Sequence, residues 1–378
     1  MINFANVKEW QIPYNGNLVD VLQVKDSNNT RVIWKKDPRP VSSNYFWMYN
    51  HKDTPITLYL EKYPSTAPTV NLYYSLDHTS WTLWGQSGLG SSRATLILPA
   101  KTVYYVRTTD RFTNTSGDAN TIWAADTNSP GLEIGGSLTG ISGPSLDNLN
   151  FYDPQAYHFT ELFSQNKELV YANNLKMPLY YNTIGSLSNE YDLSYAYTNM
   201  FSYCSNLVLP PESITQECWA TETSSGTRYI NYSIKGSDYQ YYRMFSGCTS
   251  LIKTPIIKAV KPRYGINTWD PEMGRTYTAS KSKLCGNYAF SRMFENCSSL
   301  TDIYFSSAMI RSGFSDTFYY SRVDWQANFT YATSTNISQN MFNNVANNGT
   351  VHLSSDLSSS NFASGVDGIP SGWTVVEQ

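Results

Sequence analysis

Short runs of alternating hydrophobic and polar residues, separated by turn-forming residues, make up the start of the chain. In the first 36 residues this pattern predicts three strands, at Val7–Ile12, Leu18–Lys25 and Arg31–Trp34, with turns at 14–17 and 26–29. Three short strands bury too little apolar surface to be stable alone, so we expect residues 1–36 to be a β unit that docks on another protein. The residues expected to make this docking surface are Trp10, Ile12, Val24, Ile33 and Trp34. Residues 37–43 contain two prolines and are predicted to form an extended linker.

The alternation continues from residue 44 to residue 130 and predicts seven further strands. These are expected at 45–48, 56–60, 70–75, 81–84, 94–98, 103–108 and 121–123. Such a series of short strands between turns is typical of a β-sandwich, and residues 44–130 resemble an immunoglobulin-like or fibronectin type III module. We expect Trp81 to point into its core. No pair of cysteines bridges the predicted sheets, so packing alone must stabilise this region.

Glycine recurs in the next stretch, residues 131–155. The spacing of Gly135, Gly136 and Gly140 fits neither GxGxxG nor GxxxxGKS, and no strand-to-helix pattern surrounds it. A phosphate-binding loop is therefore not expected. We interpret residues 131–155 as a Gly-rich connector between two domains.

An internal repeat dominates the second half of the chain. Its copies are Leu162-Phe163-Ser164-Gln165-Asn166, Met200-Phe201-Ser202-Tyr203-Cys204, Met244-Phe245-Ser246-Gly247-Cys248, Met293-Phe294-Glu295-Asn296-Cys297 and Met341-Phe342-Asn343-Asn344-Val345. The phenylalanines follow one another at intervals of 38, 44, 49 and 48 residues. The first and last copies have Asn166 and Val345 in place of cysteine, and atypical end copies are typical of capping repeats in a solenoid.

Phenylalanine and cysteine three residues apart fall on one face of a helical turn, and the leucine after them begins a short extended run. Each copy is therefore predicted to form one short helical turn and one strand. When copies stack, like residues superpose into buried ladders, with cysteine acting as a small hydrophobic residue. The predicted ladder residues are Phe163, Met200, Phe201, Cys204, Leu207, Met244, Phe245, Cys248, Leu251, Met293, Phe294, Cys297, Leu300, Met341 and Phe342. A metal site is not expected, because each rung supplies one cysteine and no histidine recurs with it.

The repeat, with Leu209-Pro210 or Thr254-Pro255 just beyond it, resembles the BspA-type leucine-rich repeats of bacterial surface proteins and of phages and prophages of gut bacteria. Residues 347–353 and 368–376 resemble the terminal cap of those proteins, and the opening resembles the short N-terminal unit of phage virion proteins. The resemblance implies a leucine-rich-repeat solenoid with a C-terminal cap over residues 156–378, on the external surface of a virion. The expected fold class is mainly β: a short N-terminal β anchor, an immunoglobulin-like β-sandwich and this solenoid.

The copies of the repeat are widely spaced. Leucine-rich repeats are about 20–29 residues long, so the spacing indicates insertions, or a degenerate rung plus an insertion, at about 212–239, 256–288 and 306–338. Insertions of a solenoid gather on one face, which is often the binding face. Tryptophan and tyrosine suit sugars and protein interfaces alike, unless they pack the insertion onto the solenoid. The candidate surface binding residues are Trp219, Tyr229, Tyr264, Trp269, Tyr319, Tyr320 and Trp325.

Composition narrows the function further. Charged residues make up 15% of the chain and its net charge is −3, so no positive surface is expected to bind nucleic acid. No apolar run is long enough to cross a membrane, and the N-terminus lacks the pattern of a secretory signal. The five cysteines are an odd number without a CxxC pair, which disfavours a disulfide framework and a zinc site. We expect neither a metal nor a cofactor.

Together these patterns predict a phage virion structural protein, a head or tail fibre or decoration subunit. It is expected to bind other virion proteins through residues 1–36 and a host glycan or surface protein elsewhere, and to form a homo-oligomer, a dimer or trimer, because its strand edges need cover. The alternatives are a dedicated carbohydrate- or protein-binding adhesin of a bacterial surface or a prophage, and a polysaccharide depolymerase. An enzyme is not predicted, because no spacing of carboxylates fixes the separation that glycoside hydrolysis needs. The carboxylates considered are Asp302, Asp316, Asp324, Glu217 and Glu222.

Overall fold

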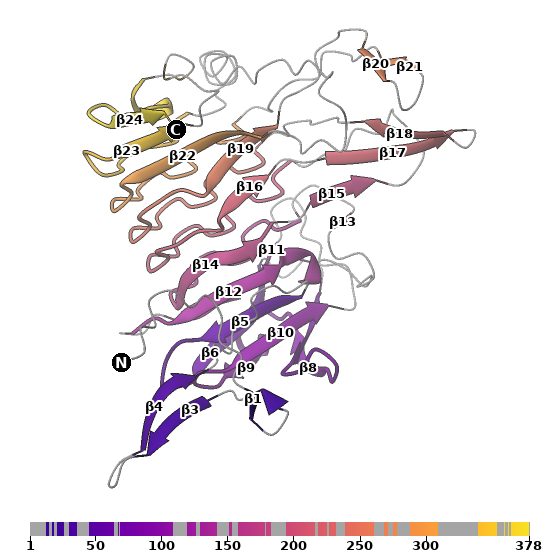
Figure 1. Cartoon of the computed structure of the whole chain (residues 1–378), viewed down its shortest axis with the longest axis vertical. Helices are drawn as coiled ribbons and strands as arrows, with labels where there is room; N and C mark the ends of the chain where they lie inside the picture. Colours follow the sequence, from indigo (N-terminus) through magenta and orange to yellow (C-terminus); the bar gives the residue numbers. More distant parts are fainter. Residues whose placement is uncertain are drawn as a thin grey trace. The chain divides into compact units, whose positions relative to one another are not determined.

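The protein is mainly β, and its computed structural model is drawn in Figure 1. The structure describes residues 45–63, 67, 69–108, 119–125, 129–141, 158–177, 194–214, 239–256, 288–305, 339–353, 359, 362 and 364–377. For the strand residues at 13–14, 17–18, 21–25, 30–35, 151–152, 179–182, 215, 218–224, 227–231, 257–260, 268–270, 275–277 and 306–308 it describes the backbone alone. The chain divides into two compact units, Met1–Val41 and Ser42–Gln378. No helix among the described residues is long and apolar enough to cross a membrane.

The N-terminal unit contains two antiparallel strand pairs. One joins β1 (Pro13–Tyr14) to β2 (Asn17–Leu18), and the other joins β3 (Val21–Lys25) to β4 (Thr30–Lys35). The register pairs Tyr14 with Asn17 and Lys25 with Thr30, and the predicted turn residues between these partners lie outside the described residues. The predicted docking residues Val24, Ile33 and Trp34 lie in β3 and β4, where only the backbone is described, and Trp10 and Ile12 lie outside the described residues.

The second unit opens with two sheets that share one hydrophobic core, referred to below as the two-sheet region, residues 45–141. All seven strands predicted there are confirmed, with ends that differ by up to three residues. They are β5 (Phe46–Asn50), β6 (Ile56–Tyr63), β7 (Asn71–Ser75), β8 (Thr82–Gln86), β9 (Ala94–Leu98), β10 (Val103–Thr108) and β11 (Ala119–Trp123), with η1 (Gly90–Ser92) between β8 and β9. The smaller sheet has the order β11-β6-β9, and the larger one contains β5-β10-β7-β8.

Alternation along the strands sets which residues enter this core. In β6, Leu58 and Leu60 are fully buried, while residues between them lie on the outer face of the smaller sheet. The expectation for Trp81 is wrong: Trp84 enters the core, and Trp81 is half-buried with the Arg107 guanidinium 4.1 Å from its ring centre. Thr82 and Leu83 are both exposed, and the register of β8 with β7 shifts between Leu83 and Gly85, so Trp84 has no direct partner in β7 and is buried, which simple alternation from Trp81 does not predict.

The Gly-rich stretch expected as a connector contains a buried strand instead. β12 (Leu132–Ser137), followed by η2 (Leu138–Ile141), pairs antiparallel with β5, and all six of its residues are buried. Its glycines make room for Trp47 of β5: a Cβ on Gly135 would stand 2.2 Å from Trp47 Cζ2. Gly136 has a φ of +74°, which glycine adopts without strain. These glycines therefore serve ring packing inside a sheet.

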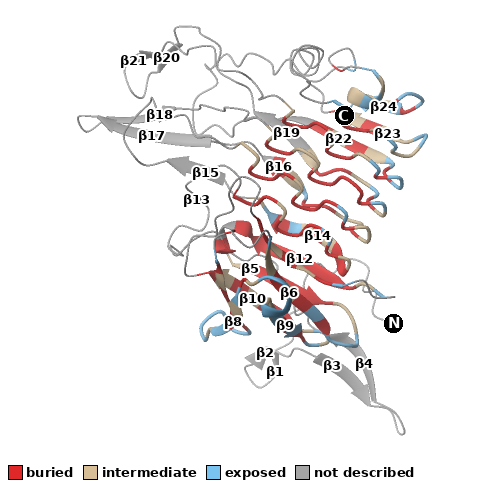
Figure 2. Ribbon diagram, turned by 180° about the vertical axis from the view of Figure 1, so that it is seen from behind, coloured by how far each residue is buried: buried red, intermediate tan, exposed pale blue. Residues whose placement is uncertain are grey.

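Strand β14 (Leu169–Lys176) continues the larger sheet into the repeats, because it pairs parallel with β12. One strand of the next sheet follows each of the four later copies, a fifth strand lies beyond the last of them, and neighbouring strands pair in parallel in the order β16-β19-β22-β23-β24. These are β16 (Ser213–Thr215), β19 (Ile256–Val260), β22 (Asp302–Ala308), β23 (Thr350–Leu353) and β24 (Thr374–Glu377). Figure 2 shows buried residues running from the two-sheet region through β14 into these strands, and they form one core cluster.

The repeated sequence itself folds into consecutive β-turns, so the prediction of a helical turn is wrong. We name these runs turn segments; they comprise residues 159–166, 197–204, 241–248, 290–297 and 339–344. In the second, Met200, Ser202 and Cys204 donate backbone N–H groups to carbonyls three residues earlier, at 3.0–3.2 Å. Asn199 and Tyr203 have positive φ, as the second central residue of a type II turn requires.

Stacking of the copies accounts for turns in place of helix. The intervening N–H groups point to the next copy: that of Phe201, for example, donates to the Met244 carbonyl at 2.8 Å. An α-helix would direct its N–H groups along its own axis and leave none for a neighbour. The described turn segments of successive copies bond directly to one another, so no further turn segment lies between them in the stack. This favours insertions over an additional degenerate rung as the reason for the wide spacing of the copies.

Two of these insertions contain short strands. The first contains β17 (Cys218–Ser224) and β18 (Thr227–Asn231), which form an antiparallel hairpin. This hairpin belongs to a sheet of the order β13-β15-β17-β18, whose other strands, β13 (Phe151–Tyr152) and β15 (Leu179–Asn182), precede the second copy. The second insertion contains the hairpin of β20 (Thr268–Asp270) and β21 (Arg275–Tyr277).

Like residues of successive copies stack inside the turn segments. Their phenylalanine rings form one column with centroids 5.3–5.8 Å apart: Phe46, Phe163, Phe201, Phe245, Phe294 and Phe342. The column begins in β5, outside the repeats. Each ladder cysteine is fully buried, and its Sγ–H donates to the phenylalanine carbonyl of the preceding copy at 3.0–3.1 Å. Burial raises the pKa of the Cys204 thiol to about 12.

The two ends of the column are closed differently. In the first copy Asn166 replaces cysteine, and its Nδ2 donates to the Ile122 carbonyl of β11 at 3.2 Å. The Ile122 N–H donates in turn to the Leu162 carbonyl at 2.7 Å, so the first turn segment is bonded to the smaller sheet. At the other end, Phe342 N–H donates to the Val366 carbonyl beside η5 (Gly365–Asp367), and Trp373 is buried with its Nε1 bonded to the Ala346 carbonyl.

Candidate binding groove

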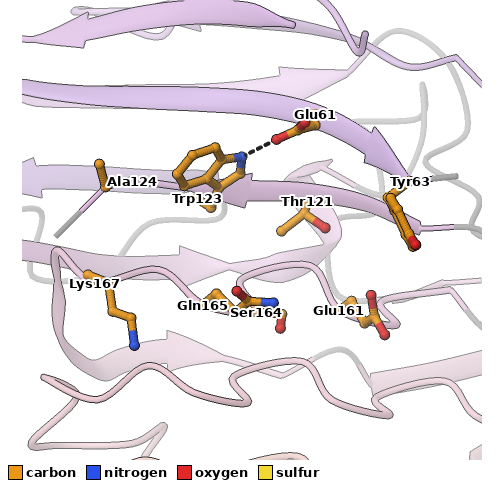
Figure 3. A pocket seen from close by; sticks show the side chains of 10 residues that line it. Glu61, Tyr63, Thr121, Trp123, Ala124, Glu161, Ser164, Gln165 and Lys167 are labelled. Atoms are coloured by element: carbon orange, nitrogen blue, oxygen red, sulfur yellow. Dashed lines mark hydrogen bonds between the residues drawn. The ribbon is translucent and has the colours of Figure 1, made fainter. Parts of the chain in front are cut away.

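A groove of about 720 Å³ lies where the smaller sheet meets the first turn segment. Figure 3 shows its two walls as rows of side chains. Tyr63, Thr121 and Trp123 lie along one wall, on β6 and β11. The other wall carries Glu161, Ser164, Gln165 and Lys167, in and just after the first turn segment.

The side chains of the first wall lie on one face because successive residues of a strand point to opposite faces. In β6, Tyr59, Glu61 and Tyr63 occupy every second position, opposite in direction to the buried Leu58 and Leu60, and lie on the outer face. In β11, Thr121 and Trp123 flank the buried Ile122 in the same way. The antiparallel register places Trp123 opposite Tyr59 and Thr121 opposite Glu61. Side chains that are far apart in the sequence thus become neighbours on one face.

Several contacts hold the indole of Trp123 in place. Its Nε1 donates to Glu61 Oε2 at 2.7 Å, and its ring lies 4.8 Å from the Tyr59 ring. The Arg93 guanidinium lies 4.1 Å from the Tyr59 centroid and 4.9 Å from that of Trp123, a cation–π contact with both rings. Arg93 also lies 3.7 Å from Glu61 Oε2. The aromatic wall is therefore preorganised by an ion pair and a hydrogen bond.

The second wall is ordered by the next copy of the repeat. Glu161 Oε1 accepts a hydrogen bond from Asn199 Nδ2 at 3.3 Å. The Lys167 ammonium donates to the Tyr203 carbonyl at 3.0 Å and to Ser205 Oγ at 3.3 Å. Both charged side chains of this wall therefore have orienting partners outside the groove.

The groove combines aromatic rings with hydrogen-bond acceptors and donors. Its carboxylates accept, its ammonium and amide donate, and its hydroxyls do both. Among the described residues no group of three or more His, Cys, Asp or Glu side chains could hold a metal ion. The arrangement is suited to binding a polar ligand.

The structure places the predicted surface binding residues only in part. Trp219, Tyr229 and Trp269 lie in β17, β18 and β20, where the side chains are outside the described set. The other four, Tyr264, Tyr319, Tyr320 and Trp325, lie outside the described residues.

Of the predicted ladder residues, all fifteen are buried. Among the carboxylates considered for hydrolysis, Asp302 is described: it lies 3.1 Å from His352 Nε2 and accepts from Thr301 Oγ1. Glu222 lies in β17 with only its backbone described, and Glu217, Asp316 and Asp324 lie outside the described residues.

Sequence reasoning missed the groove, although one signal for its first wall was present. Tyr59, Glu61 and Tyr63 occupy every second position of one stretch, which marks a polar strand face carrying two tyrosines. No pattern along the chain indicated that this face would meet Glu161 and Lys167, because that contact depends on where the first turn segment joins β11.

No family model, no curated protein and no solved structure matches this chain.

Proposed function

We propose that the chain is a structural protein of a phage virion, a fibre or decoration subunit that attaches through residues 1–36 and displays the second unit for adhesion to a host surface. The observation that carries the proposal is that the chain consists of two compact units of very different size. The first is a small strand unit, Met1–Val41, and the second contains one continuous core from Phe46 to Trp373. A continuous core suits rigid display of a binding surface.

In this proposal the two-sheet region is an immunoglobulin-like β-sandwich and the repeat region a leucine-rich-repeat solenoid of the BspA type. Two features support the solenoid: each copy contributes one strand to a parallel arrangement, and each turn segment bonds to the next. Because the sheets expose edge strands such as β24, we also propose a homo-oligomer, a dimer or trimer.

Mass spectrometry of purified virions from the source tests this function. We expect the protein at a fixed ratio to other virion proteins, and we expect a variant lacking residues 1–40 to be missing from particles. A variant that retains residues 1–40 and lacks the last strand, β24, is the matched control and should still be incorporated. Particles that carry the truncated chain at the wild-type ratio would overturn attachment through the N-terminus.

The second candidate is a dedicated adhesin of a bacterial surface or a prophage, in which assembly into particles is incidental. The preorganised groove favours it, because binding there needs no other virion protein. Absence of the protein from virions, together with binding of the purified chain to host cells, would support this candidate over the first. In neither case do we propose catalysis.

A further inference from the structure

We propose that the groove between β6, β11 and the first turn segment is a binding site for a neutral oligosaccharide. The inference rests on the adhesion part of the proposed function, and it assigns adhesion to residues outside the insertions. Three properties carry it: the aromatic wall, the balance of polar groups and the size of the groove.

The aromatic wall offers faces for sugar rings. A pyranose has an apolar face of C–H groups that packs on an aromatic ring, and a ring that is already fixed loses little conformational entropy on binding. Trp123 is fixed by Glu61, Tyr59 and Arg93. Tyr63 has 69% of its surface exposed, which leaves a large ring at the groove without protein cover.

The polar groups match hydroxyl groups and disfavour an anion. Glu61 and Glu161 accept hydrogen bonds, as sugar hydroxyls can donate them, and Gln165 and Lys167 can donate to sugar oxygens. The two carboxylates are balanced by two cations that already have partners: Arg93 lies 3.7 Å from Glu61, and the Lys167 ammonium binds the Tyr203 carbonyl and Ser205. A phosphate or a uronate would therefore find no net positive charge to attract it, whereas an uncharged sugar needs none.

The size of the groove suits a chain of a few sugars. Ligand pockets are about 300–1,000 Å³, and the groove of about 720 Å³ falls within that range. Its two rows of side chains run beside each other, as Figure 3 shows, so an extended ligand can contact both at successive positions.

Binding of the purified full-length chain to an array of neutral gluco-, galacto- and manno-oligosaccharides tests the proposal. The array also carries uronate-containing oligosaccharides and a lysine-rich peptide. We expect binding to one or more neutral oligosaccharides, and loss of affinity by about tenfold or more in Trp123→Ala, because losing a stacking contact of roughly 1.4 kcal/mol has that effect. Tyr63→Ala, at an exposed position that does not affect folding, should weaken binding by severalfold.

The matched control is Leu83→Ala. Leu83 has 52% of its surface exposed, lies in β8 of the larger sheet and is not among the residues that line the groove, so this variant should bind as the wild type does. Failure of every neutral oligosaccharide to bind would overturn the proposal. Affinities of Trp123→Ala and Tyr63→Ala that both equal the affinity of the wild type would also overturn it. Binding of the lysine-rich peptide alone would make the groove a peptide site. Virion mass spectrometry is independent of these results, so failure of the sugar site and failure of the virion assignment are distinguishable.

Discussion

The three buried thiols of Cys204, Cys248 and Cys297 predict that the protein loses stability at alkaline pH more steeply than a variant without these three cysteines does. An unfolded cysteine has a pKa of about 8.5. In the folded chain burial raises the pKa of Cys204 to about 12, and it raises the pKa values of Cys248 and Cys297 well above their usual range. The folded state therefore retains three protons that the unfolded state releases.

The sign and size of the change in the free energy of unfolding with pH follow from this difference in bound protons. Stability from each thiol is fully present below about pH 8.5 and is lost as the pH rises toward the pKa of the folded state. Between the two pKa values each thiol lowers the free energy of unfolding by about 1.4 kcal/mol per pH unit, so three lower it by about 4 kcal/mol per pH unit. That is a large share of the roughly 5–15 kcal/mol by which domains are stable.

Urea unfolding, followed by tryptophan fluorescence from about pH 8 to about pH 10, measures this slope. Cys248→Ala should reduce the slope by about 1.4 kcal/mol per pH unit, and replacement of Cys204, Cys248 and Cys297 together by about 4. All other ionisable groups are the same in every variant, so their contributions cancel in the comparison. Equal slopes in the wild type and the triple variant would refute the reasoning.

Three further predictions concern packing. Phe245 stacks on a ring on each side, so Phe245→Ala should lower the free energy of unfolding in urea by about 3–5 kcal/mol. Phe342 stacks on Phe294 alone, so Phe342→Ala should lower it by less. Equal losses of stability in the two variants would contradict a continuous column. Gly135→Ala should cost about 1–3 kcal/mol because its Cβ would overlap the Trp47 ring, and Trp47→Leu in the same chain should restore part of the loss in a double-mutant cycle. Asn166→Ala should cost about 1–3 kcal/mol by leaving the Ile122 carbonyl of β11 without its side-chain donor, which thermal unfolding of the two proteins compares; an unchanged midpoint would mean that this bond does not couple the first copy to the sheet.

The local pattern of the sequence was sufficient for the strands and for the identity of the ladder residues. Short apolar or alternating runs between turn residues located β5 to β11: in strands such as β6 one face is buried and a period of two is visible in the residues, whereas all of β5 is buried. Recurrence of Phe201, Phe245 and Phe294 with cysteine three residues later located the buried column, because stacked copies place like residues together.

What could not be predicted depends on contacts between distant segments. The spacing of phenylalanine and cysteine fits a helical turn as well as it fits consecutive β-turns, and only the bonds to the next copy favour the turns. Gly135 looked like part of a connector because glycine usually marks loops, whereas its function is to accept Trp47 from another strand. For the same reason the groove, which joins Trp123 to Glu161 across two elements, left no pattern along the chain.

The hydrogen bonds between Ile122 of β11 and the first turn segment also give the repeats a direction of assembly. In the described residues the turn segment of each copy bonds to that of the next, so a copy can add to the one before it once that one is formed. The first copy finds its template in the two-sheet region, which precedes it in the chain. Folding can therefore proceed from the N-terminal side of the second unit toward Trp373 as the chain is synthesised, and a truncation at the C-terminus should leave the earlier copies folded.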